Sequence, residues 1–310
     1  MNVLARFQKL KLTAWLLFLL TAAGFAQDGA KEVLKGEPVL WEAVSIAERD
    51  LQLGPGGREL FPNLKGLKFV GRQPGGNNLK FRLKEESGRE WVVKAADESQ
   101  PEVAAVRLLA IGYPTKVDYI VPKLSIEKLG KYKNVRFEAR PEDVKRGGRW
   151  SWDQNPFKDA PEFAGLRIMM AMFNNWDLKD ENTVILQKGD KLYYAVSDLG
   201  SSFGKLAKNS KTRSGRSVNK PEHYADTILI KDVDGGKINF AYSGQRSDLM
   251  NGIKVEHGRW LADLLLQLSD KQIEDAFRAA NYSAEDVQLL ASAFKVRIAE
   301  LGTTTRPASL

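Results

Sequence analysis

The stretch Trp176-Asp177-Leu178-Lys179-Asp180-Glu181-Asn182-Thr183-Val184-Ile185 places a carboxylate, a lysine and an amide on one loop that continues into an apolar strand. A second strand, predicted over residues 192–196, follows a Gly-Asp turn, so the two strands form a hairpin. Asn182 and Asp198 flank this hairpin at its open end. We therefore expect their oxygen atoms to lie close together.

Upstream of this stretch, apolar and polar residues alternate between glycine-bearing turns, a pattern typical of antiparallel hairpins. It predicts a three-stranded sheet over residues 67–95. The first turn contains Gly71, Gly75 and Gly76, and Lys94 ends the third strand. A helix is predicted next, opened by Ser99 and Pro101, with Glu102 in its first turn and Gly112 at its end.

Helices are predicted for most of the rest of the chain. An apolar helix begins at Pro161, and its three methionines are interpreted as core residues. In the C-terminal third, a helix is predicted over residues 260–268, and Ser269 and Ser283 are expected to cap two more helices, the second ending near Leu301.

These residue types suit phosphoryl transfer for elementary reasons. The charge of a polyphosphate must be neutralised, for which a lysine and a magnesium ion held by oxygen ligands are suitable. Asn182 and Asp198 offer such oxygens, Asp177 is a candidate base for an acceptor hydroxyl, and Lys179 could steady the transferring group. Glycines in the first turn would allow backbone amides to approach phosphates closely.

The order of these pieces resembles the protein-kinase-like superfamily, in which a glycine-rich hairpin, a strand lysine, a D-x-x-x-x-N loop and a D-x-G aspartate act together. The resemblance implies ATP and Mg²⁺ as cofactors. It assigns nucleotide binding to Gly71, Gly75, Gly76, Lys94 and Glu102, catalysis to Asp177 and Lys179, and metal binding to Asn182 and Asp198.

The resemblance also implies an α+β, two-lobed fold with a small antiparallel β N-lobe and a mainly helical C-lobe. The expected divisions are a signal peptide at 1–26, an N-terminal extension at 27–66, the N-lobe at 67–122, the C-lobe at 123–301 and a flexible tail at 302–310.

The sequence departs from the kinase pattern at several positions. Asn175 and Trp176 replace the histidine and arginine that precede the loop aspartate, and Leu199 replaces the phenylalanine of D-F-G. Glu102, the candidate partner of Lys94, follows it by only eight residues, with Glu98 as a weaker rival. This short spacing is more similar to aminoglycoside phosphotransferases and HipA-type kinases than to eukaryotic protein kinases.

The first 26 residues resemble a secretory signal peptide: a basic lead, about a dozen apolar residues and small residues before Gln27. We expect cleavage near Ala26, no stable membrane span, and export to the periplasm or outside the cell. Cleavage would remove three basic residues and lower the formal charge from +8 to +5, too little and too dispersed to favour nucleic-acid binding. With no cysteine and two histidines among 310 residues, thiol catalysis and three-histidine metal sites are excluded.

Residues 205–220 contain six basic and no acidic residues. They are either a solvated loop or a surface that recognises an acidic or phosphorylated acceptor beside the catalytic loop.

Two further interpretations remain beside an active kinase. One is a catalytically inactive pseudokinase or envelope binding scaffold; the other, a serine hydrolase using His223, has no nucleophile-elbow sequence in its favour. The chain also resembles a group of exported bacterial proteins of unassigned function, through Arg49-Asp50-Leu51, Gly54-Pro55-Gly56-Gly57, Met169-Met170-Ala171-Met172 and residues 174–182. The acceptor, the nucleotide and the oligomeric state are left open.

Overall fold

A computed structural model describes residues 34–73, 78–127, 129–208 and 214–306. The chain divides into two units, Met1–Leu34 and Lys35–Leu310, and the second contains all elements discussed here. The predicted signal peptide and its cleavage site near Ala26 lie outside the described residues, as do Gly75 and Gly76.

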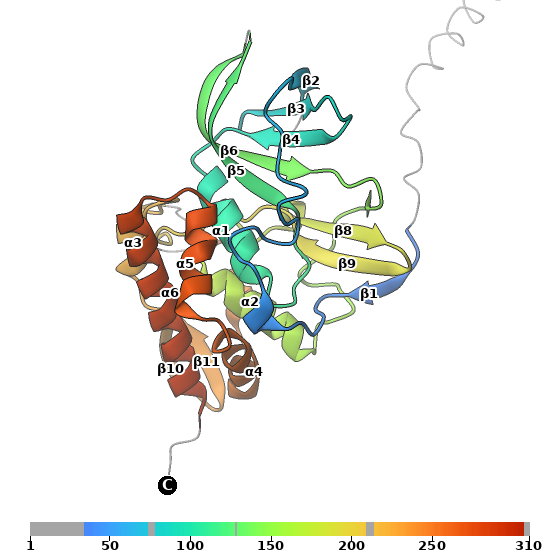
Figure 1. Ribbon diagram of the computed structural model, residues 1–310. Coiled ribbons are helices and arrows are strands. Elements are labelled where there is room, and N and C mark those ends of the chain that lie inside the picture. Colours follow the sequence, from blue (N-terminus) through green and yellow to red (C-terminus); the bar gives the residue numbers. More distant parts are fainter. Residues whose placement is uncertain (1–33, 74–77, 128, 209–213, 307–310) are drawn as a thin grey trace, which may run out of the picture. The chain divides into compact units, whose positions relative to one another are not determined.

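The N-terminal region contains a five-stranded antiparallel sheet in the order β2-β3-β4-β6-β5 (Figure 1). Its first three strands confirm the predicted hairpins: β2 (Lys68–Arg72), β3 (Lys80–Lys84) and β4 (Glu90–Lys94). Two long strands complete it, β5 (Asp118–Ile126) and β6 (Gly130–Ala139). The sheet therefore extends past residue 122, where the sequence was divided.

Pro122 explains this difference, because a proline in a strand-like run suggests that the strand ends. In the structure β5 is the edge strand of the sheet. A residue without an N–H group is tolerated at an edge, where no further strand needs that donor. The strand therefore continues through Pro122 to pair Lys123 with Lys133.

A second sheet carries the predicted catalytic hairpin. Strands β8 (Thr183–Lys188) and β9 (Lys191–Val196) form that hairpin as expected. The segment before residue 67 packs on it through β1 (Glu37–Val39), which pairs in parallel with β9, and β7 (Lys145–Arg146) extends the other edge.

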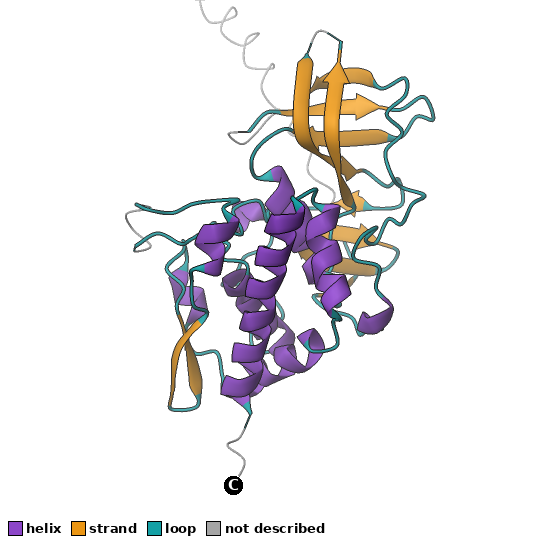
Figure 2. Ribbon diagram, turned by 60° about the vertical axis from the view of Figure 1, so that its left-hand side comes forward, coloured by secondary structure: helices purple, strands orange, loops and turns teal. Residues whose placement is uncertain are grey.

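Helices make up most of the C-terminal region (Figure 2). The expected helices are α1 (Ser99–Leu109), α2 (Pro161–Met172), α5 (Asp270–Ala279) and α6 (Ala284–Thr305). The helix predicted over residues 260–268 is α4 (Val255–Leu265), which begins five residues earlier and ends three residues earlier than expected. Ser269 and Ser283 cap α5 and α6 by accepting hydrogen bonds from backbone N–H groups, as predicted. Local sequence patterns do not predict the remaining elements: the short α3 (Pro221–Ala225), the hairpin β10 (Ile230–Asp234) and β11 (Lys237–Phe240), and the 3₁₀ turns Ile46–Glu48, Asp180–Asn182 and Ser247–Met250.

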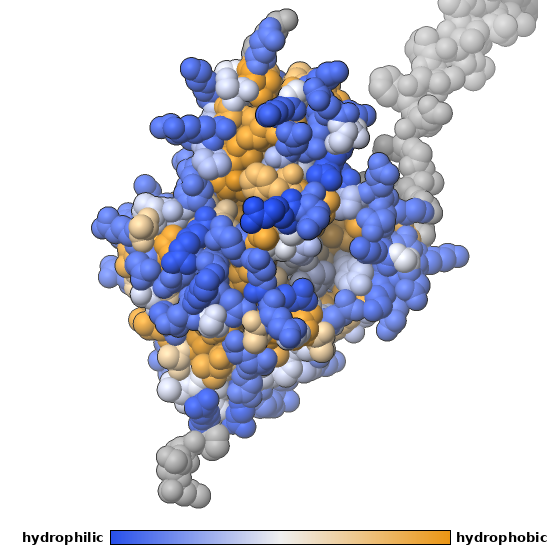
Figure 3. All heavy atoms as spheres, in the orientation of Figure 1, coloured by the Kyte–Doolittle hydropathy of each residue, from blue (hydrophilic) through white to orange (hydrophobic). Residues whose placement is uncertain are grey.

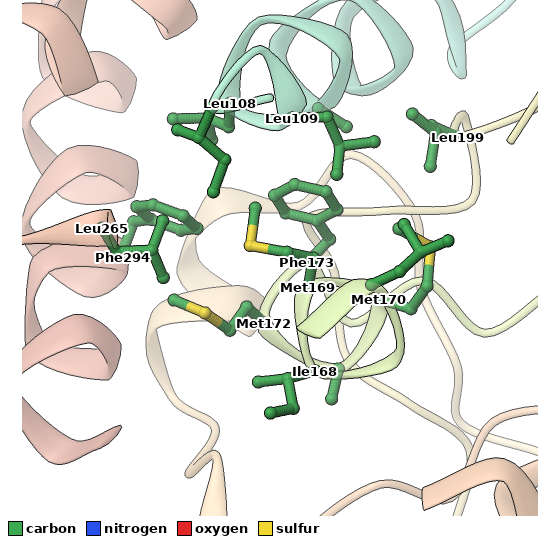
Figure 4. Close-up of a cluster of buried hydrophobic side chains, with 14 of the residues drawn as sticks. Leu108, Leu109, Ile168, Met169, Met170, Met172, Phe173, Leu199, Leu265 and Phe294 are labelled. Carbon is green, nitrogen blue, oxygen red and sulfur yellow. The ribbon is translucent and has the colours of Figure 1, made fainter. Parts of the chain in front are cut away.

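The apolar helix α2 lies at the centre of the larger core (Figure 4). Its methionines Met169, Met170 and Met172 are fully buried, as expected for core residues. Phe173 stacks on Phe294 from α6, with ring centroids 6.1 Å apart. The loop that carries the predicted catalytic residues therefore starts from a rigid, tightly packed support.

The expected flexible tail was placed too early. Helix α6 continues to Thr305, and Thr305 is fully buried. Arg259 donates to the carbonyl of Thr305 with Nε and Nη2 at 2.9 and 2.6 Å, and Gly258 leaves room for the threonine methyl group. Gly302 therefore does not end the helix, because contacts with α4 hold its last turn in place.

The surface in Figure 3 is mainly hydrophilic, with hydrophobic residues gathered over the N-terminal sheet. Two of the exposed apolar residues of the chain, Phe69 and Val70, lie on the edge strand β2. Within the described residues, none of the helices combines the length and apolar character that crossing a bilayer requires. The predicted fold class, an α+β chain with an antiparallel N-terminal sheet and a mainly helical C-terminal region, is confirmed.

Phe294→Ala should lower the free energy of unfolding by about 3–5 kcal/mol, because it removes a fully buried ring from the centre of the core. Val296→Ala, two residues away on the same helix, is the matched control: this side chain is 65% exposed, so the change should stay within about 0.5 kcal/mol. Urea titration measures both. Equal effects of the two substitutions would contradict the described packing of α6.

Candidate active site

A cleft of about 650 Å³ lies between the N-terminal sheet and the predicted catalytic loop. Five predicted site residues line it: Glu102, Asp177, Lys179, Asn182 and Asp198. The sheet, helix α1, the catalytic loop and the segment after β9 all contribute side chains. Residues far apart in the sequence therefore meet at one cavity.

Lys94 lies directly behind the wall of this cleft and is fully buried. Its Nζ lies 3.2 Å from Glu102 Oε2, 2.7 Å from Glu98 Oε2 and 3.6 Å from Asp198 Oδ1. Burial alone would lower the pKa of Lys94, but the surrounding carboxylates, Glu102 first, raise it above its usual value. Lys94 therefore stays charged, and it contacts both glutamates that the sequence offered.

Glu102 is buried on α1 and is the centre of an ionic network. Lys116 Nζ donates to its Oε1 at 2.9 Å, and Arg136 forms a second ion pair with the same oxygen. Burial alone would raise the pKa of Glu102, but Arg136, Lys116 and Lys94 hold it well below the usual range. Glu102 is therefore ionised, and it ties α1 to strands β4 and β6.

Asp198 reaches Lys94 because a glycine follows it in the D-L-G segment. A Cβ atom on Gly200 would lie 2.7 Å from the Cβ of Glu98 and 3.1 Å from Lys94 Nζ. Such distances leave no space for a side chain. The Gly200 N–H donates to Asp198 Oδ1 at 3.1 Å, which orients the carboxylate.

The catalytic loop is held by its own side chains. Lys179 Nζ donates to Asp177 Oδ2 at 2.8 Å, and Asn182 Nδ2 donates to the same oxygen at 3.0 Å. Asp177 is thus fixed by two donors from its own loop. A distant segment supports them, since the Gln245 N–H donates to the Trp176 carbonyl at 2.7 Å and the Tyr242 hydroxyl to the Asn175 carbonyl at 2.6 Å.

Two residues with oxygen donors, Asn182 and Asp198, line the cleft and could take part in holding a magnesium ion. The Nδ2 atom of Asn182 binds Asp177, which leaves the amide Oδ1 as the group to face a cation. Asp198 is 30% exposed at the cleft. The described residues contain no cluster of three or more His, Cys, Asp or Glu side chains suited to a metal. One carboxylate and one amide nevertheless fit magnesium, which keeps several waters and takes its remaining ligands from phosphates.

The glycine-rich turn is only partly described. Gly71 lies within β2 and is not among the residues that line the cleft; a Cβ there would approach only Arg82, at 4.0 Å. Gln73 and Asn78, on either side of the turn, line the cleft instead. Asn78 Nδ2 donates to Glu98 Oε2 at 2.6 Å.

Three buried charges of the network were not predicted from the sequence: Lys116, Arg136 and Glu138. In Val135-Arg136-Phe137-Glu138-Ala139 charged and apolar residues alternate, which normally indicates a strand with one face in water. Here both faces are buried, the charged one against Lys94 and Glu102. The alternation therefore predicts that Arg136 and Glu138 share one face of the strand, but it does not predict that this face is buried.

The basic segment 205–220 contributes Arg216 to the cleft lining. Its guanidinium lies over the Trp176 ring, 3.6 Å from the centroid. Lys211 and Arg213 fall outside the described residues.

No protein-family model and no curated protein matches this sequence. Among solved structures, the chain is similar to a Helicobacter pylori proinflammatory kinase, CtkA. The similarity covers 80% of this chain and 99% of that chain, with a TM-score of 0.49 and 12% sequence identity.

Glu102→Gln should lower the free energy of unfolding at neutral pH by about 3–5 kcal/mol, because three buried cations lose their shared carboxylate. The folded pKa of Glu102 is depressed, so its contribution is present above the unfolded value of about 4.3 and is lost as the pH falls below it. The difference from wild type should therefore shrink in acid.

Urea unfolding at neutral and at acidic pH measures this effect. Glu127→Gln, at the exposed end of β5, is the control and should change stability by less than about 0.5 kcal/mol at either pH. A Glu102→Gln penalty that does not depend on pH would show that the carboxylate's charge is not what stabilises the network.

Proposed function

We propose that this protein is a kinase-like phosphotransferase that moves the γ-phosphoryl group of ATP to a hydroxyl acceptor with the help of Mg²⁺. The single observation that supports this most strongly is the convergence of Lys94, Glu102, Asp198 and the Asp177 loop at one cleft. These groups come from four separate parts of the chain. Each has the chemistry that phosphoryl transfer requires.

In this proposal Asp177 is the base. Lys179 and Asn182 both bind its Oδ2, which restrains the carboxylate and leaves Oδ1 to accept the acceptor's proton. The acceptor oxygen bonds to the γ-phosphorus as the bond from that phosphorus to the β-phosphate oxygen of the leaving ADP breaks. Lys179 Nζ, 39% exposed, compensates negative charge on the group in transfer.

Asn182 and Asp198 would hold the metal ion through Oδ1 of the amide and the carboxylate. When bound, Mg²⁺ neutralises charge on the phosphate oxygens and orients them. Lys94 adds a positive charge behind Asp198, and Glu102 keeps Lys94 in its place.

In this proposal the basic segment 205–220 attracts the acceptor to the side of the cleft where Arg216 lies. Arg216 borders the cleft beside Trp176, so an acidic or phosphorylated acceptor would meet positive charge close to Asp177.

One observation favours the alternative of a non-catalytic binding module. Lys94 is fully buried and already contacts three carboxylates, so it must exchange a partner before it can contact a phosphate. In a pseudokinase these ion pairs would stabilise the fold without taking part in catalysis.

Asp177→Asn should reduce transfer of radiolabelled phosphate from ATP, including autophosphorylation, by at least about 100-fold, since the base is lost while the size of the side chain is kept. The matched control is Asp190→Asn, in the exposed turn of the neighbouring hairpin, which should retain full transfer. Transfer that survives in Asp177→Asn would reject the assignment of the base.

Mg²⁺ with a nucleotide should stabilise the wild-type protein by about 2.7 kcal/mol at a ligand concentration of 100 times its dissociation constant. Asp198→Asn should lose the magnesium-dependent part of this gain, because a neutral amide binds a hard cation more weakly than a carboxylate. Thermal unfolding with and without magnesium measures it. If no nucleotide stabilises the wild-type protein, the scaffold alternative is favoured.

A further inference from the structure

Two arginines, Arg140 and Arg146, line the cleft together with Asp177 but belong to other segments of the chain. Arg140 directly follows β6, and Arg146 ends β7. Both also line a neighbouring cavity of about 100 Å³ that Asp177 does not border. The arginine pair therefore marks a second end of the cleft, which the phosphotransfer proposal does not use.

A single carboxylate, that of Glu138, serves four cations at this end. Arg136 Nη2 and Lys116 Nζ lie 3.0 and 3.1 Å from its Oε2, while Arg146 Nη1 lies 3.4 Å from Oε1 and Arg140 pairs with the same oxygen. Glu102 shares the charges of Lys116 and Arg136 but does not reach the two outer arginines. Positive charge therefore exceeds negative charge where the arginines stand.

Like charges crowd Arg146 at this end of the cleft. Burial lowers its pKa, Glu138 opposes this, and the like charges of Arg140 and Arg136 lower the pKa further. Arg140 and Arg146 are 30% and 36% exposed, so a ligand in the cleft can reach both. An anion bound there would offset the repulsion between the two guanidinium groups.

Most residues that line the rest of the cleft are polar or charged, as the two arginines are. Among the described residues that line it, only Val92 and Trp176 are apolar, while eight are basic and six acidic. A guanidinium pair matches the oxygens of a phosphate group, to which each arginine can donate two parallel hydrogen bonds.

We propose that the ligand of this cleft carries a second phosphate-bearing end, which Arg140 and Arg146 bind. This inference rests on the proposed function, because it concerns the same cleft. The ligand is then anionic at both ends: one end lies near Lys94 and Asp198, and the other lies against the arginine pair. The phosphate donor of the proposed reaction is then either a nucleotide with an additional phosphate on its ribose or a linear inorganic polyphosphate that takes the place of ATP.

The test is isothermal titration of the full chain with medium-chain inorganic polyphosphate, and separately with adenosine 3′,5′-bisphosphate and AMP. In the double variant Arg140→Ala, Arg146→Ala, affinity for the doubly anionic ligand should fall by about tenfold or more, since two charge-assisted contacts are lost. AMP, which lacks the second phosphate, should bind the variant and wild type equally.

The matched control is Lys123→Ala, Lys133→Ala. It removes the same amount of charge, but both lysines are exposed cross-strand partners on β5 and β6, outside the cleft. Its affinities should stay within about twofold of wild type, because distant exposed charges are screened. If the double arginine variant does not fold, Arg146→Ala alone, at the more exposed arginine, should weaken binding by about threefold or more.

Arginine-dependent binding of polyphosphate identifies the inorganic chain, and arginine-dependent binding of the bisphosphate identifies the nucleotide. If wild type binds neither ligand, or if the arginine and lysine variants lose affinity equally, the inference is overturned. The proposed function is tested apart from this result: Asp177→Asn should keep the arginine-dependent binding while it loses phosphate transfer. A wild-type protein that binds through the arginines but transfers no phosphate would keep this inference and reject the proposed function.

Discussion

The ion pairs that join Glu102 to Lys94, Lys116 and Arg136 are the interaction on which the rest of the cleft depends. Charges removed from water lose several kcal/mol of hydration each, and only close opposite charges compensate for that loss. The network therefore tolerates little displacement. It connects helix α1 with strands β4 and β6, and it fixes one wall of the cleft.

The same network also positions the opposite wall of the cleft, which contains Asp198. Lys116 donates to the Ser197 carbonyl, directly before Asp198, whose carboxylate lies beside Lys94. The position of Asp198 is thus set from the N-terminal sheet as well as from the hairpin that precedes it. The Asp177 loop is held independently, by Asn182, Gln245 and the apolar helix α2. Two separate supports therefore meet at the cleft.

Local patterns predicted much of this arrangement. The alternation around the glycine-bearing turns predicted β2 to β4, and the serine caps placed the starts of α5 and α6. The resemblance to the kinase pattern paired Glu102 with Lys94, a contact that is present. The end of β5 and the last turn of α6 were misjudged because Pro122 and Gly302 normally stop an element. In the structure β5 is an edge strand, so Pro122 does not interrupt its pairing, and Arg259 binds the last carbonyl of α6, so the helix continues past Gly302.

The sequence by itself determined the types of residue available for chemistry and their order: a strand lysine, an acidic loop with its own lysine and amide, and an aspartate followed by Leu-Gly. Each of these lies in a short segment whose conformation depends on local propensity. Only the tertiary structure decided that Arg136, Glu138 and Lys116 are buried, that Gly200 is needed for close approach to Lys94, and that Arg140 and Arg146 share one carboxylate. Burial and charge balance depend on partners that are distant in the chain, and no local pattern contains them.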